Sequence, residues 1–103
     1  MSYDNVINAA ISASSTDNTI VAAVSGKSIR VLAYTIVLSG AATARFENGT
    51  SGTALTGQMS FAANGGVSAP YNPVGHFATT AGTLLNLELS ANAAAGHITY
   101  VLV

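Results

Sequence analysis

The chain has 103 residues, enough for a single domain, and it contains no cysteine, so disulfides and thiolate metal sites are excluded. Only 7% of its residues are charged, whereas about 25% are charged in an ordinary soluble domain. Three Lys and Arg residues cannot form the basic patch that nucleic acids or anionic membranes require. We therefore expect one domain over residues 1–103, with neither nucleic acid nor membrane among its partners.

The uncharged surface of the chain is itself informative. Half of the residues are apolar, and small neutral residues make up most of the remainder. A surface of this kind loses little ionic hydration when a partner covers it. The composition therefore favours a subunit that is buried against other subunits.

The first segment with regular structure is predicted at residues 6–13. Its alanines stand at helical spacing, which leaves a weak helix as an alternative. Val6, Ile7 and Ile11 are β-branched, however, and such residues favour a strand. We therefore predict a strand here.

Residues 29–38 form a longer strand that is apolar on both faces, with two alternating sets of side chains. A strand of this kind is buried on both sides. In a thin two-layer domain the second face must be covered by another subunit. This predicts that Val31, Thr35 and Val37 face outward and contribute to an interface. The two alternating sets are Leu32, Tyr34, Ile36 and Leu38 on one face, and Val31, Ala33, Thr35 and Val37 on the other.

Further along the chain, residues 42–47, 54–61, 84–90 and 98–103 alternate between apolar and polar side chains. A period of two is typical of strands with one buried face. We expect these faces to meet in a shared core. The expected core residues are Leu85, Leu87, Leu89, Leu55, Phe46 and Phe61.

Glycine and asparagine mark turns between these strands at residues 25–28, 48–52, 64–66 and 81–82, because both accept positive φ. Residues 91–95 are predicted to be a hairpin loop. Short strands at this spacing indicate a sandwich or barrel. The expected fold is all-β: an antiparallel, jelly-roll-like β-sandwich of about eight strands.

Catalytic and metal-binding patterns are not found. Ser25–Ser28 resembles the end of a phosphate-binding loop, but a strand follows it where such a loop needs a helix. His76 and His97 are not spaced as a metal pair, and the four acidic residues are expected to be exposed and far apart. Arg45 and Glu47 lie on one strand face and are interpreted as a solvated or interface pair. We therefore expect no enzyme activity, no catalytic residues, no metal and no cofactor.

One loop stands out as a candidate interface. Pro70 and Pro73 bracket residues that are expected to be extended and ordered. The aromatic residues flanking this loop make it the one place where a ligand or partner patch is indicated. The candidate residues are Tyr71, Asn72, His76 and Phe77. Because the chain has no tryptophan, a carbohydrate site is only weakly supported here.

Several runs resemble a family of small structural proteins of tailed phages and prophages. They are GKSIRVLAY at 26–34, YNPVGHF at 71–77, AG at 81–82, LNLELS at 85–90 and TYV at 99–101. The resemblance covers the chain from about residue 20 to its end. Proteins of the family more often have a tryptophan at the position of His76, and many of them have no assigned role.

The resemblance implies a jelly-roll-like subunit of the virion that forms a homotrimer. It implies a capsid decoration, or cement, protein bound to the phage major capsid protein over junctions between its subunits. Such a protein would be assembled in the host cytoplasm and carried on the capsid surface. The alternative is a phage tail or fibre accessory, or a module whose loops bind a receptor glycan.

Overall fold

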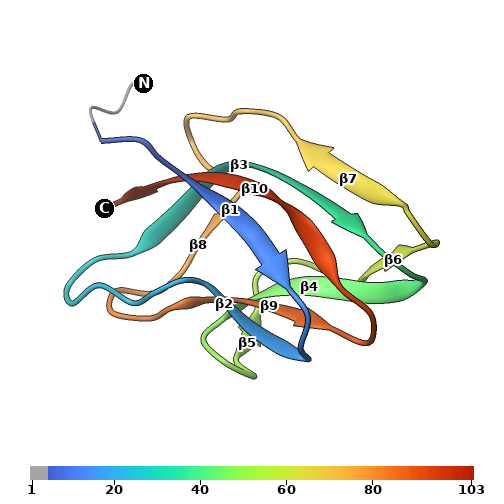
Figure 1. Cartoon of the computed structure of the whole chain (residues 1–103). Helices are drawn as coiled ribbons and strands as arrows, with labels where there is room; N and C mark the ends of the chain where they lie inside the picture. The colour runs from blue at the N-terminus through green and yellow to red at the C-terminus, as the bar shows by residue number, and fades with distance from the viewer. Residues whose placement is uncertain (1–4) are drawn as a thin grey trace.

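A computed structural model describes residues 5–103, and within this range the protein consists of strands joined by turns, with no helix (Figure 1). The strands are β1 (Ile7–Ala13), β2 (Asp17–Val21), β3 (Ile29–Leu38), β4 (Ala42–Asn48), β5 (Thr53–Ala54), β6 (Met59–Phe61), β7 (Gly66–Ala69), β8 (Phe77–Ala78), β9 (Leu85–Leu89) and β10 (Ala94–Leu102). The predicted strand at residues 6–13 is confirmed as β1.

The strands form two antiparallel sheets that pack face to face. Sheet A has the order β1-β10-β3-β7, with β8 also paired to β3. Sheet B has the order β2-β9-β4-β5, with β6 also paired to β4. Because β7 and β8 share one side of β3, and β5 and β6 one side of β4, the ten segments fill eight sheet positions. The chain passes between the sheets in the order of a jelly roll, so the predicted β-sandwich is confirmed.

The core lies between the two sheets and consists largely of the residues that alternation predicted. The three inward leucines of β9 and Phe46 of β4 are almost completely buried in one cluster. Leu55 and Phe61 are half-buried and pack against that cluster. Aliphatic side chains of β3 and β10 form the opposing wall, among them Ile36 and Ile98. Burial of these apolar surfaces provides most of the stabilisation of the fold.

The prediction for the outward face of β3 is wrong for Val31, which is fully buried in the core cluster. The register between β3 and β10 shifts so that Val31 pairs with Tyr100 and Ala33 with Thr99, which leaves Leu32 as an extra residue. Such a bulge displaces the alternation of side chains by one position. Beyond the bulge the predicted alternation holds, and Val37 is 44% exposed on the outer face.

Two other segments differ from the prediction. Residues 54–61 do not form one strand, because the chain is paired with β4 only at Thr53–Ala54 and again at Met59–Phe61. Residues 94 and 95, which were predicted to be in a loop, begin β10 and pair with both β1 and β3. Alanine has no strong preference for strand over loop, so the conformation of residues 94 and 95 is decided by the pairing of β10 on both of its sides.

Candidate functional site

The loop at residues 70–76, between β7 and β8, is bonded to the backbone of β3. The Asn72 amide donates to the Leu32 carbonyl at 2.9 Å, and the His76 amide donates to the Val31 carbonyl at 2.8 Å. Between these two attachments, Gly75 has a φ of 94°. A side chain at Gly75 would strike the Arg30 side chain, so both the conformation and the close approach require glycine.

Further hydrogen bonds make the loop rigid. The Asn72 side-chain oxygen accepts from the Val74 amide at 3.0 Å, and the Asn72 carbonyl accepts from the Gly75 amide at 2.9 Å. The His76 Nε2 lies 2.7 Å from the Pro70 carbonyl and closes the base of the loop. Two proline rings restrict φ at the same time. The predicted ordered loop is therefore present, and Asn72 and His76 hold it together from within.

The loop presents two apolar side chains to solvent. Tyr71 is 54% exposed and Val74 is 69% exposed, the largest exposures among the big hydrophobic residues described. Ordering a loop before binding removes much of the entropy cost that a partner contact must otherwise overcome. Tyrosine in particular is a frequent anchor at protein interfaces. The loop is therefore built to offer an apolar contact.

The other candidates from this region have structural contacts of their own. Phe77 is half-buried, and its ring lies 5.2 Å from that of Phe46 and 6.0 Å from that of Tyr34. The His76 ring stands edge-on to Tyr34 at 6.1 Å. Burial raises the pKa of the Tyr34 hydroxyl above its usual value. These rings close the space between the sheets at the base of the loop, so Phe77 packs against the core more than it faces solvent.

Most of the outer face of sheet A is neutral, and its charged residue, Arg30, lies on β3 before the bulge, beside the loop at residues 70–76. From the bulge to the end of β3, the outward side chains form rows across the paired strands, and none of them is Asp, Glu, Lys or Arg. The rows are Ser12, Ala95, Val37 and Gly66; then Ala10, His97, Thr35 and Ser68; then Asn8, Thr99 and Ala33. Small side chains make such a face flat and inexpensive to dehydrate. Thr35 and Val37 therefore lie on a surface suited to contact, although the sequence did not reveal its full extent.

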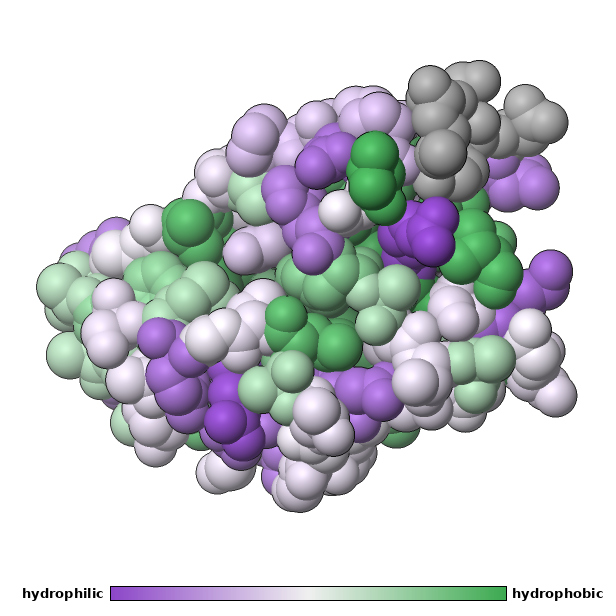
Figure 2. Space-filling view, turned by 180° about the vertical axis from the view of Figure 1, so that it is seen from behind, coloured by the Kyte–Doolittle hydropathy of each residue, from purple (hydrophilic) through white to green (hydrophobic). Residues whose placement is uncertain are grey.

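Seen from behind, much of the molecule is pale, the colour of small residues of intermediate hydropathy, with strong purple in only a few places (Figure 2).

A hollow of about 310 Å³ opens at one end of the sandwich, where β1, β3 and β10 meet. It is lined by small residues together with Val37 and Leu38. No charged side chain is among its lining residues, so it offers shape and apolar contact without an ionic group to orient a ligand.

The outer face of sheet B is its opposite, because charged residues gather there around Asn86. Asn86 is fully buried, and its side-chain nitrogen donates to Glu47 at 2.8 Å and to Asp17 at 3.0 Å. Its side-chain oxygen accepts from the Asn18 amide at 2.8 Å. The side-chain nitrogen thus donates two hydrogen bonds and the side-chain oxygen accepts one. Through these bonds Asn86, on β9, links β2 and β4.

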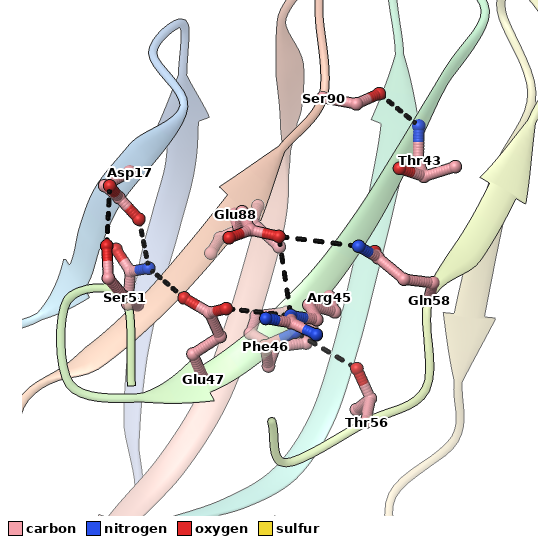
Figure 3. Close-up of polar contacts among 12 residues, drawn as sticks. Asp17, Thr43, Arg45, Phe46, Glu47, Ser51, Thr56, Gln58, Glu88 and Ser90 are labelled. Carbon is pink, nitrogen blue, oxygen red and sulfur yellow. Dashed lines mark hydrogen bonds and ion pairs between the residues drawn. The ribbon is translucent and has the colours of Figure 1, made fainter. Parts of the chain in front are cut away.

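Glu47, Glu88 and Asp17 make further contacts with Arg45 and Ser51, shown in Figure 3. Arg45 Nε lies 2.8 Å from Glu47 and 3.4 Å from Glu88. The hydrogen bond to Glu47 raises the pKa of Arg45, and the charge of Glu88 acts in the same direction. Ser51, in the turn before β5, donates to Asp17 at 3.3 Å, so this turn reaches across the outer face of sheet B.

The expectation that the acidic residues are exposed and far apart is wrong for three of them. Asp17, Glu47 and Glu88 each place a carboxylate oxygen within 4.8 Å of the others, and Glu47 has no exposed surface. Asp4 lies outside the described residues. The Arg45–Glu47 pair is present, but Glu47 is buried rather than solvated. Adjacent strands bring the acids together, because Asp17 and Arg45 both pair with Glu88.

Carboxylate oxygens are the ligands that calcium and magnesium prefer, so this is the one group among residues 5–103 with the composition of a metal site. A positive charge is already present beside these carboxylates, because Arg45 contacts two of the three. Asn86 directs donors, rather than an acceptor, at Glu47 and Asp17. No buried side-chain nitrogen or oxygen described here lacks a partner. The arrangement therefore acts as a structural network that fastens the β4–β5 turn to sheet B.

The two histidines do not join this group. His97 is exposed on the outer face of sheet A, opposite Thr35, whereas His76 is part of the loop at residues 70–76. Neither is a member of the metal-capable acid group. The expected absence of a metal and of catalysis stays a prediction.

A scan against models of protein families and a search of curated proteins found no match to this chain. Within residues 5–103 there is also no helix with the length and hydrophobicity needed to cross a bilayer.

Proposed function

We propose that this protein is a non-catalytic structural subunit of a tailed-phage virion. In this role it decorates the capsid, binds the major capsid protein over junctions between its subunits, and associates with copies of itself. The observation that carries the proposal is the distribution of charge. Of the six charged residues in the described range (seven in the chain, less Asp4), four lie in the network on sheet B. Of the other two, Lys27 lies in the connection between β2 and β3, and Arg30 lies on β3 beside the loop, so the rows of small side chains on the outer face of sheet A contain none.

This distribution suits a subunit that is covered on one side. On sheet B the buried polar atoms of the charged residues are hydrogen-bonded within the network. The neutral face of sheet A and the ordered loop lie in the same half of the sandwich, because the loop joins two strands of sheet A. A partner that covers the rows of small side chains and the tip of the loop dehydrates neutral groups and two exposed apolar side chains, Tyr71 and Val74. The number of copies, three, comes from the resemblance.

The direct test is the composition and binding of virions. Particles of the phage whose genome encodes this chain should carry it on the head, and purified protein should bind capsids that lack it until the sites are saturated. Recovery of the protein only with tails or fibres would replace capsid decoration with the tail accessory role. Absence from purified virions would overturn both.

Replacing Val37 with aspartate is expected to dissociate the homo-oligomer. The side chain is 44% exposed in the end row of the neutral face, beside the hollow, and a carboxylate buried there in an interface would have no partner. The measurement is molar mass by light scattering at micromolar concentration. Val24→Asp is a matched control, because Val24 is 39% exposed in the connection between β2 and β3. A wild-type protein that is monomeric under these conditions would contradict the assembly.

Replacing Tyr71 with alanine is expected to weaken capsid attachment about tenfold or more, which corresponds to the loss of one aromatic anchor. Because Tyr71 is more than half exposed, its truncation should leave the unfolding midpoint nearly unchanged. Titration of capsids with labelled protein gives the affinity. Tyr71→Phe keeps the ring and should bind almost normally, and Val24→Ala removes exposed apolar surface elsewhere. Equal affinity of Tyr71→Ala and wild type would exclude the loop from the contact.

A further inference from the structure

β1 is an edge strand with a free side. It pairs with β10 along all seven of its residues, Ile7–Ala13, and no described strand lies on its other side. Alternate backbone amides and carbonyls of an antiparallel edge strand point away from its neighbour. These groups are a template for another strand, and proteins usually protect such edges against pairing.

The other edges of the sandwich are protected. The second edge of sheet A is divided between β7, with four residues, and β8, with two. On sheet B one edge is divided between β5, with two residues, and β6, with three. The remaining edge, β2, carries Asp17 and has an irregular register between Thr19 and Val21. Short strands, charges and bulges are the common means of preventing edge pairing.

β1 has none of these protections. Its sequence, INAAISA, contains neither a charged residue nor proline, and its register with β10 is regular throughout. Its outward residues Asn8, Ala10 and Ser12 are all exposed. The longest free edge among residues 5–103 is thus also the one without a charge, a proline or a bulge.

We propose that β1 pairs antiparallel with β1 of a second copy about a two-fold axis that passes beside Ala10. The two A sheets then form one continuous sheet across the contact. An interface of this kind uses the same strand on both copies, as two-fold symmetry requires. Backbone hydrogen bonds provide the affinity, and the fit of facing side chains selects the partner.

The sequence of β1 is self-complementary in this register. Centring the axis on Ala10 places Ala10 opposite itself, and it uses all seven residues. Core-facing Ile7 then meets Ala13 and Ala9 meets Ile11, while outward Asn8 meets Ser12. Apolar side chains therefore meet apolar ones, and polar side chains meet polar ones.

Other registers are worse for stated reasons. A shift of the axis to lie between two residues would place core-facing side chains opposite outward ones, which the packing of sheet A forbids. Moving the axis to Ala9 or Ile11 keeps the faces matched but leaves two residues of each β1 without a partner. The contact goes beyond the proposed virion role and does not depend on it, because it joins two copies whether or not each also belongs to a ring of three.

The absence of cysteine from the natural chain allows a clean cross-linking test. Facing residues of an antiparallel pair have Cβ atoms about 4.5–5.5 Å apart, close to the span of a disulfide. Under mild oxidation Ala10→Cys should therefore give covalent dimers as the main species on a non-reducing gel. Asn8→Cys and Ser12→Cys should cross-link poorly alone and efficiently when mixed. Ser68→Cys, exposed on β7 at the opposite edge, is the matched control.

A second variant reads out the same contact without a disulfide. Ala10→Lys places a charge on the exposed face of the edge strand, where it should halve the molar mass measured by light scattering and leave the circular dichroism spectrum unchanged. The proposal is overturned if Ala10→Cys cross-links no faster than Ser68→Cys. It is equally overturned if mixing Asn8→Cys with Ser12→Cys adds nothing, or if Ala10→Lys keeps the wild-type mass. Failure of capsid binding would leave all three readouts intact, so the two proposals fail separately.

Discussion

Replacing Phe46 with alanine is expected to lower the free energy of unfolding by about 3–5 kcal/mol, the usual cost of removing a fully buried aromatic side chain. Phe46 has no exposed surface, and its ring lies 5.0 Å from that of Tyr34 in an edge-on arrangement. The Phe77 ring is 5.2 Å away on another side. The substitution would leave a cavity and remove the contacts of sheet B with the Tyr34 and Phe77 rings.

A loss of this size is a large share of the total stability of a small domain, which is about 5–15 kcal/mol. Urea unfolding followed by circular dichroism should show the midpoint falling by about 1–5 M, given a slope of about 1–3 kcal/mol per M. Phe61→Ala is the matched control, because Phe61 is half-buried at the margin of the same cluster. If the two substitutions cost the same, Phe46 is not the centre of the packing.

Replacing Asn86 with aspartate is expected to destabilise the protein by about 3–5 kcal/mol at neutral pH. The change replaces a buried hydrogen-bond donor with a negative charge beside two other carboxylates. The substitution removes the hydrogen bonds to Glu47 and Asp17 and sets a carboxylate against both. Arg45 is bonded to Glu47 and cannot neutralise a further charge on its far side. The β4–β5 turn, which is tied to Asp17 through Ser51, should loosen as well.

The pH dependence of this variant has a definite sign. Repulsion from Asp17 and Glu47 raises the pKa of the new carboxyl in the folded state above its unfolded value of about 3.9. The folded state therefore binds a proton more readily than the unfolded state, and the destabilisation relative to wild type shrinks as pH falls from 7 towards 4. The measurement is the difference in unfolding free energy at several pH values.

Asn5→Asp provides the control for this series, since Asn5 is exposed and precedes β1, outside the network around Asn86. Its effect should be within about 0.5 kcal/mol at every pH. If Asn86→Asp is as stable as Asn5→Asp, or if its deficit in unfolding free energy is the same at pH 5 and pH 7, the buried network does not have the role assigned to it.

The sequence alone was sufficient for the fold class and for most of the core. Alternation with a period of two in β9 places Leu85, Leu87 and Leu89 on one face whatever the partner strand is. The turn residues and the paired prolines were equally informative, because positive φ and fixed φ are local properties of the backbone. Each of these features depends on neighbours in sequence.

Only the tertiary structure decided which side chains meet across the sheets. The bulge at Leu32, which buries Val31, arises from the register between β3 and β10 and leaves no mark in the pattern of β3 itself. In the same way, Glu47 and Asn86 alternate as solvent-facing residues should, yet strand pairing and the β4–β5 turn bury them. Periodicity determines the direction in which a side chain points, whereas its burial and its partners depend on segments distant in the chain that fold against it.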